Sequence, residues 1–118
     1  MTDSTTAAIG EHIRAFNHRD VAALMNGFTD DAVWITGTTI VRGRAALTEL
    51  FTDAMAELLP TLTIQNLLVT TDHAACQLIE TLTVASEERV YSIAGFYHLR
   101  DGLIASAKIY REGTADIT

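Results

Sequence analysis

The stretch that decides the fold is Ile93–Glu112, IAGFYHLRDGLIASAKIYRE. Apolar residues alternate on both sides of Asp101-Gly102. Asp-Gly between alternating apolar runs is a strong hairpin signal, because glycine accepts the positive φ that the turn requires. This pattern predicts two long antiparallel strands, at residues 89–100 and 103–111.

Upstream of this hairpin, much of the sequence has the apolar period of helices. Helices are predicted at residues 5–17 and 21–28, with Asp20 as the N-cap of the second. A third helix has an apolar stripe that runs from Leu47 to Leu59, and the only proline of the chain follows it. Proline ends a helix because it lacks the backbone N–H and clashes with the preceding turn.

Two short strands are predicted before the third helix. After that helix the apolar period changes to two, which predicts further strands. Helices first and long consecutive strands last predict an α+β protein of one domain, residues 1–118. Its three N-terminal helices pack on a strongly curved, mainly antiparallel sheet that encloses a pocket. The remaining predicted strands are 32–36, 39–41, 62–69 and 73–84, with turns at Asp30-Asp31 and Glu87-Glu88.

Composition limits the classes of function. The 118 residues are 48% hydrophobic and carry a net charge of −7. Eight scattered basic residues argue against nucleic-acid binding, which needs clustered Lys and Arg. No apolar run reaches the roughly 18 residues of a membrane span, and the start of the chain lacks a signal-peptide pattern, so we expect a cytoplasmic protein. Cys76 is the only cysteine and is predicted to be a buried structural thiol.

Three segments together resemble the SnoaL-like group of the nuclear transport factor 2 (NTF2)-like superfamily. They are AFNHRDVAALMNGFTDDAVWITG at 15–37, VRGRAALTELF at 41–51 and GFYHLRDGLIASAKIYRE at 95–112. The resemblance implies a cone-shaped fold with a hydrophobic pocket for an apolar small molecule. It also implies that the chain forms a homodimer and needs no cofactor. The superfamily includes polyketide cyclases, ketosteroid isomerases, epoxide hydrolases and non-catalytic binding domains, so fold alone does not decide activity.

Ketosteroid isomerases use a carboxylate base at a position that corresponds to Thr36, which cannot act as a base near neutral pH. The residues that correspond to their two oxyanion donors are His12 and Gly95. A carboxylic acid kept neutral by an apolar site is one of those donors in that enzyme. Glycine has no donor side chain, so the resemblance does not extend to a standard isomerase.

Epoxide hydrolases of the superfamily carry an Arg-x-Asp pair on one strand and a second Asp on the closing strand. The corresponding residues are Leu78, Glu80 and Ile109. Trp34 and Thr36 fall where these enzymes hold water with Tyr and Asn. One acid survives as Glu80, whereas the Arg and the second acid are absent.

Glu80 and His12 are the predicted catalytic residues. Glu80 shares strand parity with Cys76, Leu78 and Leu82, so it is expected to point toward an apolar face. Desolvation there raises the pKa of a carboxyl group toward the range useful for acid–base catalysis. The alternatives are a wet position at the rim or a structural pair with Lys108.

His12 lies on the apolar stripe of the first helix. It is either a core histidine or a donor or proton shuttle that faces Glu80 across the cavity. The predicted substrate-binding residues are mostly aromatic or aliphatic, because an apolar ligand needs an apolar wall. They are Phe16, Trp34, Thr36, Phe51, Met55, Leu78, Tyr91, Tyr97 and Ile109.

The outer face of the sheet is predicted to carry Phe96 and His98, which have the opposite parity from Tyr97. Exposed aromatic residues on such a face indicate a partner, and the resemblance makes that partner a second copy of the chain. His18, His73 and His98 lie far apart in the sequence and show no metal-ligand spacing, so no metal site is predicted.

Three functions follow from these residues. The first is a small enzyme of cyclase, isomerase or hydrolase type that acts on an apolar carbonyl- or epoxide-bearing metabolite. The alternative is a non-catalytic small-molecule-binding or accessory domain. A third is a dimeric scaffold whose interior is filled by Trp34, Phe51, Met55 and Tyr97 in mutual contact.

Overall fold

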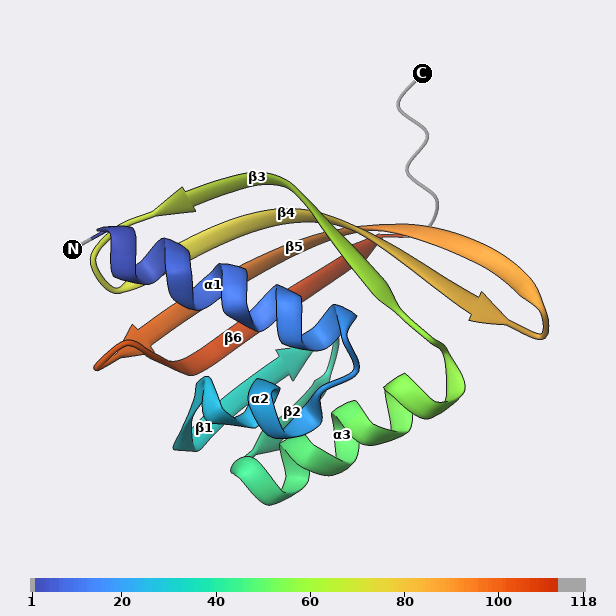
Figure 1. The fold of residues 1–118 in the computed structure, drawn as a ribbon, viewed down its shortest axis with the longest axis horizontal. Helices are drawn as coiled ribbons and strands as arrows, with labels where there is room; N and C mark the ends of the chain where they lie inside the picture. Colours follow the sequence, from blue (N-terminus) through green and yellow to red (C-terminus); the bar gives the residue numbers. More distant parts are fainter. Residues whose placement is uncertain (1, 113–118) are drawn as a thin grey trace.

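The computed structural model describes residues 2–112, and over this range three helices accompany a sheet of six strands. The strands lie in the order β2-β1-β6-β5-β4-β3 (Figure 1). Neighbouring strands are antiparallel except β1 and β6, which are parallel. The elements in chain order are α1 (Thr2–Asn17), α2 (Val21–Asn26), β1 (Phe28–Thr36), β2 (Thr39–Arg42), α3 (Arg44–Glu57), β3 (Thr61–Val69), β4 (His73–Val84), β5 (Glu87–Arg100) and β6 (Leu103–Glu112).

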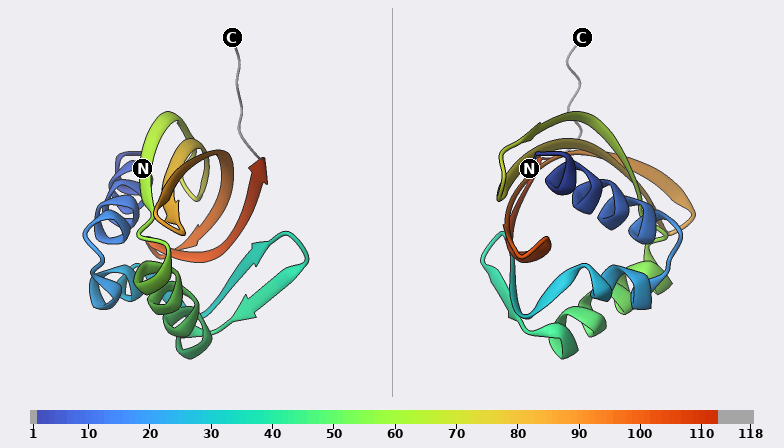
Figure 2. Two further views of the ribbon diagram at one scale, coloured as in Figure 1. Left: turned by 90° about the vertical axis from the view of Figure 1, so that its right-hand side faces the viewer. Right: turned by 60° about the vertical axis from the view of Figure 1, so that its left-hand side comes forward.

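The long strands β3 to β6 curve over the helices, as two further views show (Figure 2). α1 lies against β3 and β4, and α3 lies against β1 and β2. Sheets of long strands twist strongly, so one face becomes concave and the helices cover it. The predicted α+β cone, with helices packed on a curved sheet, is therefore confirmed.

The hairpin that decides the fold forms as predicted. Arg100 pairs with Leu103, and the two turn residues, Asp101 and Gly102, have φ angles of 54° and 79°. Positive φ at both central positions matches the right-handed twist of the flanking strands. Near the same end of the hairpin, the register between β5 and β6 shifts between His98 and Leu99. Bulges of this kind increase strand twist.

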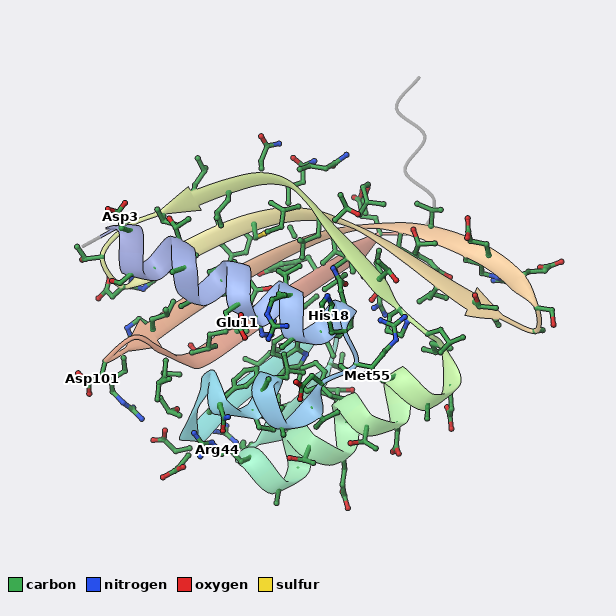
Figure 3. The ribbon with its side chains drawn as sticks, viewed as in Figure 1. Asp3, Glu11, His18, Arg44, Met55 and Asp101 are labelled. Atoms are coloured by element: carbon green, nitrogen blue, oxygen red, sulfur yellow. The ribbon has the colours of Figure 1, made fainter. Side chains whose placement is uncertain are left out.

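Asp30 and Asp31 do not form the predicted turn but lie inside β1. Pairing of β1 with β6 is interrupted by a bulge between Phe28 and Val33, and both aspartates are exposed there. Arg44 lies 3.0 Å from Asp30, at the start of α3 beside β1 (Figure 3). The two aspartates therefore lie at a bulge within a strand. Exposed acidic residues occur both in bulges and in turns, so residue type alone did not separate the two.

The predicted turn at Glu87-Glu88 is also wrong. The turn is formed by Ala85 and Ser86, which have φ angles of 52° and 67°. Both glutamates belong to β5, where Glu87 pairs with Val84. A two-residue loop of this type needs positive φ at both positions and usually carries glycine or asparagine, but Ala85 and Ser86 occupy it here, so the sequence carried no turn signal at this point.

Helix ends differ from prediction by a few residues. α1 begins at Thr2, whereas α2 ends at Asn26, so that the fully buried Phe28 begins β1. Asp20 caps α2 as predicted, since its Oδ1 accepts a hydrogen bond from the backbone N–H of Ala23 at 3.0 Å. Capping chemistry located the start of α2, whereas the apolar period located the other helix ends only to within a few residues.

β3 loses its simple alternation at a bulge between Ile64 and Asn66. Beyond this point Leu67 packs on the core, while Leu68 is 72% exposed on the outer face. One extra residue in a strand transfers every following side chain to the opposite face. Across residues 2–112, no helix is both long and apolar enough to cross a membrane.

Candidate functional site

A cavity of about 180 Å³ lies between the helices and the concave face of the sheet. Its wall is mainly aliphatic and aromatic and also carries a few polar groups, which is typical of small-molecule sites. Every predicted site residue except Met55 and Tyr91 lines it: His12, Phe16, Trp34, Thr36, Phe51, Leu78, Glu80, Tyr97 and Ile109. Residues from both helices and strands therefore meet as the alternation patterns predicted.

Met55 and Tyr91 lie elsewhere than predicted. Met55 is buried in the core on α3, one helical turn beyond Phe51, and it does not line the cavity. Tyr91 is half-buried and lies beside Arg111, whose guanidinium carbon is 5.7 Å from the centre of the tyrosine ring. Tyr91 therefore supports another residue of the site and does not form its wall.

Glu80 points into the cavity from the middle of β4 and is only 5% exposed. Its Oε1 accepts a hydrogen bond from Nη2 of Arg111 at 2.6 Å. Among the described residues, Oε2 has no hydrogen-bond partner. Burial raises the pKa of the Glu80 carboxyl, and the charge and hydrogen bond of Arg111 only partly offset this effect.

Lys108 is not the structural partner of Glu80 that the sequence left open. Its Nζ lies on the other side of the sheet, 5.2 Å from the ring centre of Tyr110. Arg111 takes that place, and the sequence analysis missed it. The signal was available, because Arg111 is two residues beyond Ile109 on β6 and shares its inward parity. Arg111 keeps 46% of its side chain exposed, so it lies at the open end of the cavity.

His12 is buried in a ring of aromatic side chains. The centres of the Phe28, Trp34 and Tyr97 rings lie 5.5, 5.9 and 5.7 Å from the centre of the imidazole. Nδ1 of His12 has no hydrogen-bond partner among residues 2–112. Burial lowers the pKa of His12 to about 4, so the ring is neutral at pH 7 and has one N–H to donate.

Tyr97 lies over Gly95 on the inner face of β5. A Cβ at Gly95 would stand 2.7 Å from the Tyr97 hydroxyl oxygen, so only glycine leaves room for this ring. Burial, and secondarily the Cys76 thiol, raises the pKa of Tyr97, which keeps the phenol protonated. The Tyr97 hydroxyl therefore lies beside Gly95, the residue that corresponds to the acidic donor of ketosteroid isomerases.

The cavity persists although aromatic rings crowd one side of it. The Trp34 and Phe51 rings are 5.0 Å apart and nearly perpendicular, and Trp34 lies 6.5 Å from Tyr97. Edge-to-face contacts of this kind stabilise a rigid wall. A scaffold with a filled interior predicted mutual contact without a void, and that prediction is wrong because the void is present.

Cys76 is buried, as its strand position predicted. Burial raises the pKa of its thiol to about 11, so it is a neutral, unreactive group near pH 7. Phe96 and His98 lie on the opposite face of β5, and Phe96 is 53% exposed. The structure also brings His73 to His98, which sequence spacing did not foresee, with ring centres 4.6 Å apart.

With this geometry established, comparison with protein families identifies the class. The chain belongs to the SnoaL-like domain family, whose model matches residues 9–107, within the NTF2-like superfamily. Comparison with curated proteins gave no match. The family membership confirms the resemblance found in the sequence and leaves the particular reaction open.

Solved structures with the same fold are distant in sequence. An epoxide hydrolase of the LEH-like type from M. tuberculosis is 16% identical, with a TM-score of 0.86 over 94% of this chain and 84% of that one. A Catenulispora acidiphila protein with a ketosteroid isomerase-like fold, in complex with trimethylamine, is 16% identical, with a TM-score of 0.80 over 87% and 83%. An NTF2-like protein of unknown function from Burkholderia pseudomallei is 9% identical, with a TM-score of 0.83 over 94% and 91%. The TM-scores establish the shared fold, and at such low identities they establish the fold alone.

Proposed function

We propose that this protein is a small enzyme, acting in the cytoplasm as the sequence predicts, that performs acid–base chemistry on an apolar metabolite bound in the cone. The observation that carries the proposal is Glu80, a carboxylate held in an apolar cavity with one oxygen left for a substrate. A buried carboxylate with a raised pKa suits proton transfer near neutral pH. Cyclase, isomerase and hydrolase reactions all contain such a step.

Enolisation is the reaction that best uses these groups. Oε2 of Glu80 takes a proton from the carbon next to a carbonyl, the electron pair of that C–H bond forms a C=C bond, and the π pair of the carbonyl moves onto its oxygen. The neutral His12 ring or the Tyr97 hydroxyl donates a hydrogen bond to the resulting enolate oxygen. Returning the proton to another carbon completes an isomerisation, and attack of the enolate on a second carbonyl closes a ring. In both cases electrostatic stabilisation comes from fixed donors.

Arg111 sets how much of Glu80 is charged. Without its guanidinium, burial alone would favour the protonated carboxylic acid, which cannot act as a base. With the guanidinium at 2.6 Å, the carboxylate form is stabilised while Oε2 stays free. The ion pair thus supports a base at a position where the surrounding wall disfavours charge.

The same ion pair favours the alternative function, a non-catalytic binding domain. Arg111 could neutralise Glu80 for structural reasons, and the acids of related enzymes correspond here to Thr36, Gly95 and Ile109. A binding domain would hold an apolar ligand against Trp34 and leave Glu80 without a chemical role. The two functions differ in one measurable property, which is proton transfer by Glu80.

A general base in an apolar cavity can be tested without knowing the natural substrate. The probe is 5-nitrobenzisoxazole, a flat molecule from which a base removes the ring C–H proton while the N–O bond breaks and a coloured cyanophenolate forms. Binding is followed by quenching of Trp34, the only tryptophan of the chain. Turnover above that of free acetate, with an apparent pKa above the usual value for Glu, supports the proposal.

The control is Glu80→Gln, which keeps the shape of the side chain and removes the base. We expect unchanged Trp34 quenching and a loss of roughly 10²- to 10⁴-fold in turnover, the usual contribution of a general base. Quenching without any turnover in the wild type would overturn the catalytic role and leave the binding domain. Equal turnover in wild type and variant would assign the reaction to another group.

We also propose that the outer face of the sheet joins two copies of the chain. An apolar groove of about 410 Å³ lies on this face, with Phe96 and Leu68 along it. Large exposed apolar groups on a regular sheet favour self-association. Light scattering after size exclusion should report a dimer, and Phe96→Lys should give a monomer. Ile40→Lys, at an equally exposed site on β2, is the matched control and should leave the dimer intact.

A further inference from the structure

Two histidines and a carboxylate meet where the β3–β4 turn faces the end of β5, at the left in Figure 1. His73 and His98 are direct partners across the two strands, and their rings are 4.6 Å apart. Nδ1 of His73 donates a hydrogen bond to Oδ1 of Asp72 at 2.8 Å. One potential ligand atom from each of the three residues lies within 4.8 Å of the others.

The backbone around these side chains is fixed. The N–H of Leu99 donates to the carbonyl oxygen of Asp72 at 2.7 Å, which ties the turn to the strand that carries His98. The N–H of Thr70 donates to the carbonyl oxygen of His73 at 2.8 Å and closes the turn. Two strands and a closed turn therefore present the three side chains, and sites on such elements hold ligand geometry better than open loops do.

We propose that Asp72, His73 and His98 form a zinc site with three protein ligands and a fourth coordination position that these residues leave open. Imidazole nitrogen and carboxylate oxygen are ordinary zinc ligands, and a three-ligand set leaves one tetrahedral position free. Ligand atoms around a tetrahedral zinc ion lie roughly 3.4 Å apart, as metal–ligand distances of about 2.1 Å require. Asp72 and His73 are exposed, so their side chains can close the remaining separation by rotation.

The overall charge of the chain also favours a cation. The chain carries a net charge of −7, which raises the local concentration of cations. Lys108 lines the same outer groove, and its ammonium lies over the Tyr110 ring. The site lies at the start of β4, seven residues before Glu80, and on the other face of the sheet. Zinc binding is therefore independent of the acid–base chemistry proposed for the cavity.

The test is calorimetric titration of zinc chloride into untagged, chelator-treated protein. We expect saturable binding of one zinc ion per chain in the wild type. His98→Gln and Asp72→Asn should each weaken binding by about tenfold or more, because each removes a ligand. Cobalt chloride, titrated in parallel, should give the visible absorption of a tetrahedral ion with nitrogen and oxygen ligands.

His18→Gln is the matched control, since His18 is an exposed histidine in the turn after α1, far from the β3–β4 turn (Figure 3). It should bind zinc as the wild type does, and circular dichroism should show all variants folded. Absence of saturable binding at millimolar zinc would overturn the proposal, as would affinities unaltered in His98→Gln. Molecular mass is recorded at each zinc concentration, and a zinc-dependent dimer lost in the same variants would place a second copy at the fourth position.

Discussion

Two arginine–carboxylate pairs in this protein have almost the same geometry and opposite electrostatic character. Arg111 lies 2.6 Å from Glu80 inside the cone, and Arg100 lies 2.5 Å from Asp31 on the surface. The pKa of Glu80 is raised, because burial outweighs the nearby positive charge. The pKa of Asp31 is lowered, because the hydrogen bonds from Arg100 and Thr29 dominate in water.

The difference teaches that a short ion-pair distance does not by itself define a functional acid. The Asp31 side chain is 71% exposed, and a pair of that kind is screened and interchangeable with solvent. The Glu80 side chain is 6% exposed and surrounded by an apolar wall, so its proton affinity responds to whatever enters the cavity. Burial, decided by the curvature of the sheet, separates the chemical site from the structural one.

The largest expected effect on stability comes from His12, a second buried titratable group of the cavity. The folded pKa of His12 is about 4, against an ordinary histidine value of 6.5, so between these pH values the unfolded chain binds a proton that the folded chain does not. Stability contributed by His12 is therefore complete above pH 6.5 and falls as the pH drops toward 4. The loss is up to about 3 kcal/mol, from the shift in pKa.

Urea unfolding of the wild type and of His12→Phe across this pH range measures that effect. The difference between the two proteins isolates His12, because both contain Glu80. On its own, Glu80 acts with the opposite sign: its raised pKa lets the folded chain bind a proton at a higher pH than the unfolded chain does. The variant should lose less stability than the wild type between pH 6.5 and 4. Parallel curves would mean that the imidazole is not shielded from water.

Removing the arginine from each pair separates the two regions directly. Arg111→Met strands the buried Glu80 carboxylate and should cost about 2–3 kcal/mol at pH 7, below the usual range for buried pairs because Arg111 is half exposed. The pKa of Glu80 should rise further. Arg100→Met leaves Asp31 in water and should produce no measurable change in unfolding. Equal losses in the two variants would contradict the distinction between the pairs.

A smaller effect is expected from a single added methyl group on the inner face. Gly95→Ala places a Cβ against the Tyr97 ring, which is itself buried, and should destabilise the protein by about 1–2 kcal/mol. It should also displace the Tyr97 hydroxyl and lower turnover of the benzisoxazole probe. Gly10→Ala is the control on exposed α1, where nothing meets the new Cβ. That change should stabilise the helix by roughly 0.5–1 kcal/mol.

The spacing of apolar residues along strands and helices predicted much of the site. Alternation along β4 identified Glu80 as inward-facing, and the helical stripe placed His12 and Phe16 on the same cavity. The same reasoning could have found Arg111, which lies two residues beyond Ile109 on β6 and shares its parity. Asp30-Asp31 and Glu87-Glu88 were mistaken for turns, because charged pairs occur equally in exposed strand positions and bulges.

The sequence by itself determined the helices, the long hairpin and the apolar face on which Glu80 lies, because each depends on contacts between near neighbours in the chain. Only the tertiary structure decided that Arg111 meets Glu80 and that His73 meets His98. Those pairs join residues that are 31 and 25 positions apart, and their meeting depends on strand register and sheet curvature. Register and curvature result from packing over the whole sheet, so no short segment contains them.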